Sequence, residues 1–246
     1  MRFHAFRDFE DGTIIDGLGF DIVVHRRSVG TINLPSGQLI ACDPLHALDT
    51  EPFALNLEPG QYPVHLLVAE LRDERRNAYA VVRVGEGPVR RWEPAEMSLP
   101  AANSDQPDAP RPSLLDTLDE DPGYPVDSSL GAFMDATTAG ALIDYHQIVM
   151  PEDNDFERLL LARLRKRRRS GAGYGTLDLR RDLKLPMPEG LNLIAFDAGF
   201  GPGHYPTYVG LGDEGQVISV VTDFQVLDLR FPSFPLPAAT SLDEFE

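Results

Sequence analysis

Short apolar runs that end at Gly, Pro or Asp constrain the fold of this 246-residue chain more than any other feature. The runs are rich in β-branched and aromatic residues and have the length of strands rather than helices. They lie at Phe20–Val24, Gln38–Cys42, Tyr62–Leu71, Ala78–Val84, Leu191–Phe196, Tyr205–Leu211 and Gln216–Phe224. Two further stretches predict helices: Phe133–Tyr145, rich in Ala and Met, and Asp153–Arg168, with acids in its first turn and arginines at its end. We therefore predict a β-rich α+β fold.

A corner motif, Pro-Gly-(x)-Tyr-Pro, recurs at residues 59–63, 122–125 and 202–206. Gly permits positive φ, a residue before Pro is extended, and Pro can begin a strand without a backbone donor. Two copies follow a Leu-Ile-Ala-x-Asp stretch and precede a strand, a polar turn and a strand. The echo predicts two related antiparallel sheets, packed as a sandwich or split barrel, with about two central helices. The alternative is chance recurrence of a short turn motif.

Composition along the chain predicts the domain organisation. Residues 1–98 form an N-terminal β-rich half, and residues 113–230 form a C-terminal half with the helices and a β-hairpin. Residues 99–112, rich in Pro, Ala and Asp, are expected to be a loop or linker between them. Residues 231–246 form a Pro-rich acidic tail, and Arg169–Thr176 is a second stretch expected to be flexible.

The charge balance bears on the class of partner. The chain has 39 acidic and 22 basic residues, a net charge of −17. Such a field repels nucleic acid and anionic membranes and attracts basic proteins, although solubility alone is an alternative reason for it. The single cysteine, Cys42, the lack of a signal-like segment in Met1–Gly12 and the lack of a long apolar run predict a soluble cytoplasmic protein.

The candidate site is acidic. Asp127 and Asp135 flank the stretch after the second corner, and Asp197, His204 and Asp223 lie in the C-terminal hairpin region. If the two halves face each other, these five side chains converge on one cleft, where they could hold a divalent metal or act as acid and base. The candidate metal ligands are Asp127, Asp135 and His204, and the candidate pocket also includes Gly201, Gly203 and Tyr205. The alternative for the acids is a role in turns and helix caps.

Other motifs indicate less. The glycine-rich stretch 199–203 contains Pro202, which lacks a donor, and precedes a strand, so it does not fit a phosphate-binding loop. Arg163–Arg169 places six cations in seven positions, which is typical of a solvated helix end, and its role is left open. The candidate nucleophiles and bases lack a recognised catalytic arrangement; they are Cys42, Ser128, Ser129 and His146.

Several stretches also resemble a known family. They are residues 34–37, 41–44, 59–64, 73–75, 92–95, 126–135, 199–210 and 221–224. In this order they are similar to the bacterial family catalogued as domain of unknown function 4241. That family has Gly-Thr-Gly-Cys where this chain has Ser129–Ala132, and Gly-Asp-Gly where it has Gly201–Gly203. A catalytic Cys or Asp of the family at those positions would be missing here, so the resemblance implies a fold more than a function.

Taken together, these features favour a binding or interaction protein that uses an acidic surface on a basic protein partner, with an immunity-type protein as one version. No cofactor is expected. The alternative is a metal-dependent hydrolase built on the Asp/His site, with a divalent metal as its cofactor. The sequence does not decide whether the chain is an enzyme, which partner it binds or what its oligomeric state is.

Overall fold

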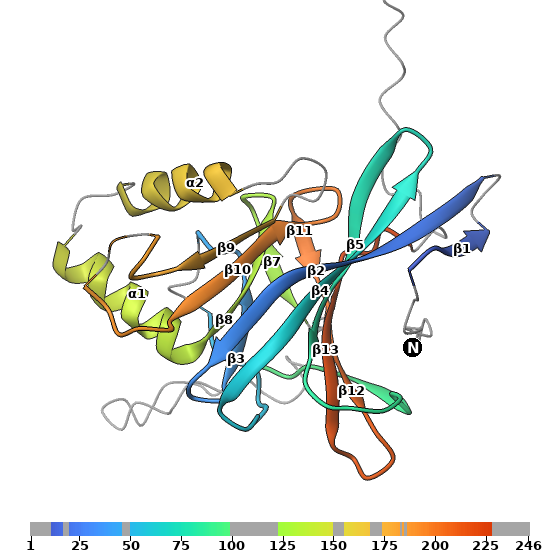
Figure 1. Ribbon diagram of the computed structural model, residues 1–246, viewed down its shortest axis with the longest axis horizontal. Helices are drawn as coiled ribbons and strands as arrows, with labels where there is room; N and C mark the ends of the chain where they lie inside the picture. The colour runs from blue at the N-terminus through green and yellow to red at the C-terminus, as the bar shows by residue number, and fades with distance from the viewer. Residues whose placement is uncertain are drawn as a thin grey trace, which may run out of the picture.

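The structure is a computed structural model that describes residues 11–16, 20–45, 50–98, 123–149, 155–167, 174–182, 184 and 186–227. The described residues form antiparallel sheets and two helices (Figure 1). The strands are β1 (Thr13–Asp16), β2 (Asp21–Leu34), β3 (Leu39–Cys42), β4 (Gly60–Leu71), β5 (Glu74–Arg83), β6 (Arg91–Pro94), β7 (Tyr124–Val126), β8 (Leu130–Asp135), β9 (Tyr174–Asp178), β10 (Asn192–Asp197), β11 (Gly203–Tyr205), β12 (Thr207–Leu211) and β13 (Val217–Asp223). The helices are α1 (Ala136–Val149) and α2 (Asp155–Arg167). Neither described helix combines the length and the apolar character that a membrane span requires.

The elements stack in three layers. A four-stranded sheet, in the order β3-β8-β10-β9, lies between the two helices and a seven-stranded sheet. Successive residues of its strands point to opposite layers. In β10, Leu193 and Ala195 pack with α1 and α2, whereas Ile194 and Phe196 pack with the larger sheet. Burial on both faces explains why β10 is apolar over Leu193–Phe196 and β8 over Leu130–Met134.

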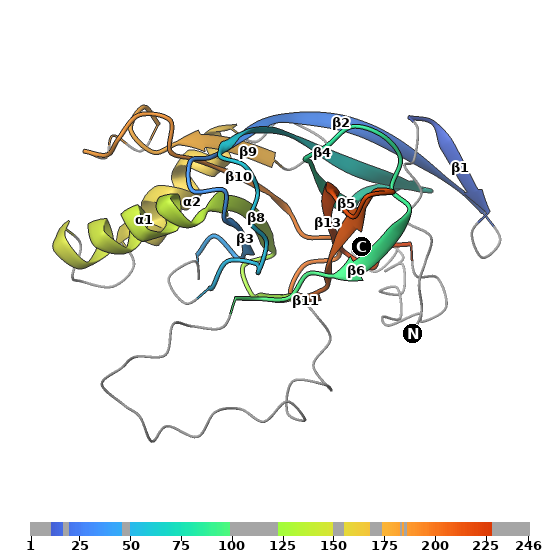
Figure 2. The same ribbon diagram turned by 90° about the horizontal axis from the view of Figure 1, so that it is seen from below.

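The seven-stranded sheet is curled and has the order β1-β2-β4-β5-β13-β12-β6. Its long strands β2 and β4 arch over the smaller sheet (Figure 2). The pairing of β2 with β4 shifts register between Ser28 and Gly30, where Gly30 has a φ of 128°. At this bulge the hydroxyl of Thr176 in β9 donates to the carbonyl of Val29 at 3.0 Å, which ties the two sheets together.

The prediction of a β-rich α+β fold is confirmed, and a strand lies at each of the seven predicted positions. Both predicted hairpins also form, as β4–β5 and β12–β13. The hairpins lie side by side in one sheet, because β5 pairs with β13. Similarly, β3 from the N-terminal segment pairs with β8 from the C-terminal one, so both larger sheets contain strands of both segments.

Other boundaries differ from the prediction. The first predicted helix, Phe133–Tyr145, begins too early. Phe133–Asp135 end β8, and α1 begins at Ala136. A short buried strand has no polar alternation, so its apolar run cannot be told from a helix by periodicity alone. Strands β1, β6, β7, β8, β9 and β11 were missed, and β9 begins inside the stretch expected to be flexible. The predicted linker (99–112) and tail (231–246) lie outside the described residues.

The tyrosines of the first and third corner motifs close their turns in the same way. Tyr62 donates its hydroxyl to the carbonyl of Glu58, and Tyr205 donates to that of Gly201 at 2.7 Å. The tyrosine ring folds back over the preceding glycine, since a Cβ on Gly203 would lie 3.2 Å from the Tyr205 hydroxyl. Close packing is therefore the reason that glycine is favoured at position 203. The positive φ inferred from the sequence is not the reason, because the φ of Gly203 is not positive.

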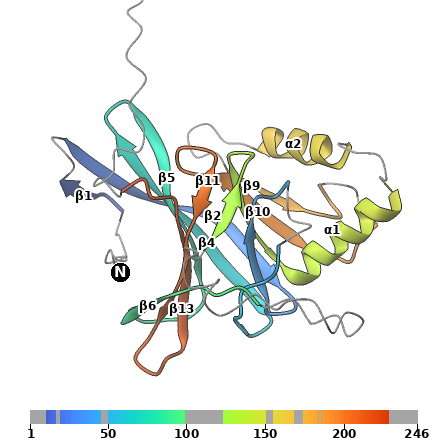
Figure 3. The same cartoon turned by 180° about the vertical axis from the view of Figure 1, so that it is seen from behind.

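The second and third corners pair with each other. They form the two-stranded sheet of β7 and β11, with Tyr124 opposite Tyr205 (Figure 3). A Cβ on Gly123 would lie 2.2 Å from the carbonyl oxygen of Tyr205, so only glycine allows this approach. This small sheet positions the turns that follow β7 and precede β11.

The aromatic contact at the centre of the core is a test of the layered packing. Phe196 is fully buried, with its ring centroid 5.1 Å from that of Phe133 and 5.8 Å from that of Phe224. We expect Phe196→Ala to lower the free energy of unfolding by about 3–5 kcal/mol in urea denaturation. Phe200→Ala is the control, because that ring is 51% exposed and its loss should cost less than about 0.5 kcal/mol. Equal losses for the two variants would contradict the described packing.

Candidate functional site

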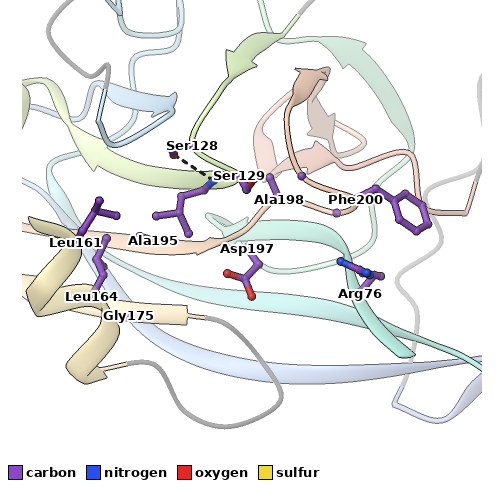
Figure 4. A pocket seen from close by; sticks show the side chains of 13 residues that line it. Arg76, Ser128, Ser129, Leu161, Leu164, Gly175, Ala195, Asp197, Ala198 and Phe200 are labelled. Carbon is purple, nitrogen blue, oxygen red and sulfur yellow. Dashed lines mark hydrogen bonds between the residues drawn. The ribbon is translucent and has the colours of Figure 1, made fainter. Parts of the chain in front are cut away.

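A cavity of about 360 Å³ lies where β10 ends, between the turn after β7 and helix α2 (Figure 4). Five separate parts of the chain form its wall. The lining residues are Arg76, Ser128, Ser129, Leu130, Leu161, Leu164, Gly175, Ala195, Asp197, Ala198, Gly199, Phe200 and Gly201. This volume falls within the range of about 300–1,000 Å³ that is usual for small-molecule sites.

The two ends of the cavity differ in chemistry. Leu161 and Leu164 of α2 lie at one end, and Arg76 of β5 and Phe200 lie at the other (Figure 4). The carboxylate of Asp197 lies between the two ends. The cavity therefore joins an apolar wall to a charged and aromatic one.

The turn from Ala198 to Gly201 shapes the charged end. Gly199 and Gly201 have φ values of 37° and 115°, a region that favours glycine. A Cβ on Gly199 would also lie 2.8 Å from the Cβ of Phe224. The amide of Ala198 donates to the carbonyl of Ser129 at 3.0 Å, so this turn and the turn before β8 hold each other in place.

Ser129 occupies a strained position beside that turn. Its φ is 66°, which is uncommon for a residue with a side chain. Its hydroxyl makes no hydrogen bond to another described residue. The neighbouring Ser128 differs, because its hydroxyl donates to Asp43 at 2.7 Å and accepts from the amide of Leu130 at 3.3 Å. Ser129 is therefore the serine at this site whose hydroxyl can turn toward a ligand.

The guanidinium of Arg76 is held by two neighbours. Its Nε donates to Glu74 at 3.0 Å, and its Nη2 donates to the same carboxylate oxygen. Its Cζ lies 5.5 Å from the centroid of the Phe200 ring, within the range of a cation–π contact. These contacts keep the positive charge of Arg76 at the mouth of the cavity.

The residues predicted from the sequence do not all meet at this cavity. Asp197 and Gly201 line it. Gly203, His204 and Tyr205 form β11 immediately after the lining turn; His204 is exposed, whereas Tyr205 is buried. The remaining acids, Asp127, Asp135 and Asp223, do not line it.

Asp135 instead ties α1 to the turn before β3. It is fully buried, and one oxygen accepts from the amide of Thr137 at 2.7 Å, an N-cap contact at the start of α1. The other oxygen accepts from the amide and the hydroxyl of Ser36, at 3.1 and 2.8 Å. Asp135 is thus a capping residue, and both of its oxygens already accept hydrogen bonds from the protein.

Asp43 makes a second buried link that sequence reasoning missed. Its carboxylate accepts from the amides of Asp127 and Ser128 at 2.9 and 2.7 Å, from the Ser128 hydroxyl, and from the amide of Leu45 at 3.0 Å. Asp43 is 1% exposed. The link fixes the turn that carries Ser129 into the cavity wall. In the sequence, Cys-Asp-Pro at 42–44 is part of a stretch that resembles the family, but the sequence alone predicted no role for Asp43.

The described residues contain no group of three or more His, Cys, Asp or Glu side chains that could hold a metal ion. The proposed ligands Asp127, Asp135 and His204 do not form such a group. Asp135 is buried and accepts hydrogen bonds from the protein, whereas Asp127 and His204 are exposed. The metal-dependent hydrolase stays a prediction. A calorimetric titration with Mg²⁺, Mn²⁺ and Zn²⁺, repeated on Asp127→Asn, would test it.

The buried link at Asp43 predicts a large stability effect. Asp43→Ala leaves several buried amide and hydroxyl donors without an acceptor, so we expect it to lower the free energy of unfolding by about 3 kcal/mol or more. Asp127→Ala is the matched control, because its side chain is exposed and should contribute less than about 0.5 kcal/mol. Chemical denaturation followed by circular dichroism measures both. A small effect of Asp43→Ala would show that Asp43 does not support this turn.

The burial of Cys42 predicts an unreactive thiol. Burial raises the pKa of this thiol well above its ordinary value, and the neighbouring Asp43 charge raises it further. Since the thiolate is the reactive form, a thiol-specific disulfide reagent should label Cys42 only after denaturation. Rapid labelling of the folded protein, followed by mass spectrometry, would contradict this and would reopen Cys42 as a nucleophile.

Comparison with known proteins identifies one family. Curated proteins and solved structures give no match to this chain. A family model described as "Protein of unknown function (DUF4241)" matches residues 32–222, well over half of the chain and from within β2 to within β13. The matched range includes both buried carboxylates and every residue that lines the cavity. The chain therefore belongs to the family of unknown function DUF4241.

Proposed function

We propose that this protein is a cytoplasmic binding module that uses an acidic surface to hold a basic protein partner, with an immunity-type protein that neutralises a toxin as one version. The observation that carries the proposal is a surplus of exposed carboxylates that have no cation within the described parts of the chain. Such a surface favours a partner that supplies positive charge.

The ion pairs of the described surface account for this surplus. Several arginines already have an acidic partner, for example Arg75 with Glu70 at 2.6 Å and Arg90 with Asp213 at 3.0 Å. By contrast, a larger group of exposed acids makes no ion pair with another described residue. Its members are Asp21, Glu51, Glu58, Asp73, Glu86, Glu96, Asp127, Asp144 and Glu214. Over the whole chain acids outnumber bases by 39 to 22, a net charge of −17.

One part of this surface is a reasonable starting point for the interface. Residues 52–54 lie beside residues 96–98, joined by the bridge of Phe53 with Met97. The amide of Ala54 donates to the carbonyl of Glu96 at 2.8 Å, so this edge is fixed by backbone hydrogen bonds. Glu96 lies in this pairing, Glu51 comes just before it and Glu58 follows it before β4; we call these three residues the acidic edge. Their fixed backbone lowers the entropic cost of binding a partner there.

Three of the candidate catalytic groups have structural positions, which favours binding over catalysis. Asp135 caps α1 and accepts from Ser36, Ser128 donates to the buried Asp43, and Cys42 is buried. These groups hold turns and a helix end together. The exposed acids remain available to a partner.

A capture experiment followed by salt titration tests the proposal. Tagged protein is used at low salt to isolate partners, and the dissociation constant of each purified partner is measured by calorimetry at rising salt. We expect a basic partner whose affinity falls about tenfold or more between about 50 and about 200 mM salt. For the immunity version, co-expression should relieve growth arrest caused by the partner. Affinity that does not change with salt would contradict an acidic binding surface.

The same titration on charge variants tests the acidic edge. The triple variant Glu51→Gln, Glu58→Gln, Glu96→Gln should weaken binding more than Asp73→Asn, Glu86→Gln, Glu214→Gln, which removes equal charge from other loops. Equal weakening by both triples would show that only the total charge matters and that the edge is not the interface.

A further inference from the structure

The cavity at the end of β10 presents three kinds of group in a row. Leu161 and Leu164 form the apolar end, Asp197 lies in the middle, and Arg76 with Phe200 forms the far end (Figure 4). An apolar surface, a negative charge and a positive charge thus follow one another across a single small cavity. This order restricts the class of ligand that can satisfy all three.

Arg76 retains hydrogen-bonding capacity toward a ligand. A guanidinium has five N–H donors, and Arg76 uses its Nε and Nη2 on Glu74. Its Nη1 makes no hydrogen bond to another described residue, so both N–H groups of this atom can donate to an anionic group. A guanidinium prefers a carboxylate or phosphate, whose oxygens match its planar geometry.

Asp197 can hold a cation in addition to its present contacts. Its backbone carbonyl accepts from Asn77 Nδ2 at 2.8 Å, which fixes the residue at the strand end. Its side chain lines the cavity, and the residue takes part in a further interaction within the protein. A carboxylate has two oxygens with about four acceptor sites, so an existing interaction does not prevent it from binding an ammonium group.

The opposite end of the cavity has no charged lining side chain. Leu161 and Leu164 come from α2, with Leu130, Gly175 and Ala195 from the sheet beneath. This wall suits an aliphatic side chain, since burial of apolar surface contributes about 25 cal/mol per Å². Ser129 adds a hydroxyl that no described residue engages, next to the turn at Gly201.

We propose that this cavity binds a free α-amino acid or short peptide with an aliphatic side chain. The ligand carboxylate pairs with Arg76, the α-ammonium pairs with Asp197, and the side chain packs on Leu161 and Leu164. This site goes beyond the protein-binding function proposed above and rests on different residues.

Other ligand classes fit less well. A purely anionic ligand, such as a phosphate, would meet the negative charge of Asp197. A purely cationic ligand would meet Arg76, and a wholly apolar one would leave the polar groups of the cavity without water or partners. A zwitterion with an apolar side chain satisfies all three zones together.

Calorimetry with a matched ligand set tests the proposal. The probes are L-leucine, leucinamide without the carboxylate, N-acetyl-leucine without the ammonium, and glycine without the side chain, with leucyl-leucine as the peptide probe. We expect L-leucine or leucyl-leucine to bind, and each single deletion from leucine to weaken its binding about tenfold or more, the usual effect of losing one charged hydrogen bond or the burial of one aliphatic side chain. If neither leucine nor leucyl-leucine binds at about 10 mM, or if the single-charge analogues bind as tightly as leucine, the proposal is wrong.

Variants of the protein locate the site. Arg76→Gln should reduce affinity for leucine about tenfold or more but change affinity for leucinamide little, because leucinamide lacks the group that Arg76 binds. Asp197→Asn should also reduce affinity for leucine about tenfold or more but change affinity for N-acetyl-leucine little, because N-acetyl-leucine lacks the ammonium group that Asp197 binds. The controls are Arg90→Gln and Asp213→Asn, which remove the charges of an exposed ion pair that does not line the cavity. Circular dichroism melting confirms that each variant is folded. If the controls weaken binding as much as Arg76→Gln, the cavity is not the site.

Discussion

The four-stranded sheet is buried on both faces, and the rest of the structure depends on this burial. The helices cover one face, and the curled seven-stranded sheet covers the other. Phe196 and Phe133 fill the space between the sheets, while Leu193 and Met134 fill the space beneath the helices. Because β8 and β10 have no face toward water, any polar group at their ends must find a partner inside the protein.

Two buried carboxylates meet that requirement. Asp135 at the end of β8 accepts hydrogen bonds from Ser36 and from the start of α1, and Asp43 after β3 accepts them from the turn before β8. Each connects segments that are more than eighty positions apart. Asp43 thereby fixes the turn that carries Ser128 and Ser129 into the cavity wall, whereas Asp135 fixes the start of α1.

The cavity and the acidic surface illustrate two different uses of charge. On the described surface, the carboxylates that pair with no described cation are the basis of our proposal of a basic protein partner. In the cavity, Asp197 and Arg76 present single charges of opposite sign beside an apolar wall, which favours a small ligand whose charges and apolar part follow the same order.

At Ser129, where the resemblance to the family predicts glycine, the φ of 66° explains why glycine suits that position.

Seven of the strands, the two hairpins and the corner motifs follow from the sequence, because each depends on residues within a few positions of one another. The pairing of β5 with β13 and of β3 with β8 does not, since alternation of side chains does not specify which strands become neighbours. The same limit applied to the site. Asp127, Asp135 and Asp197 looked alike as acids near turns, and only the tertiary structure made one exposed, one a buried helix cap and one part of a cavity wall. The reason is physical: the role of a carboxylate depends on which donors reach it, and those donors come from distant parts of the chain.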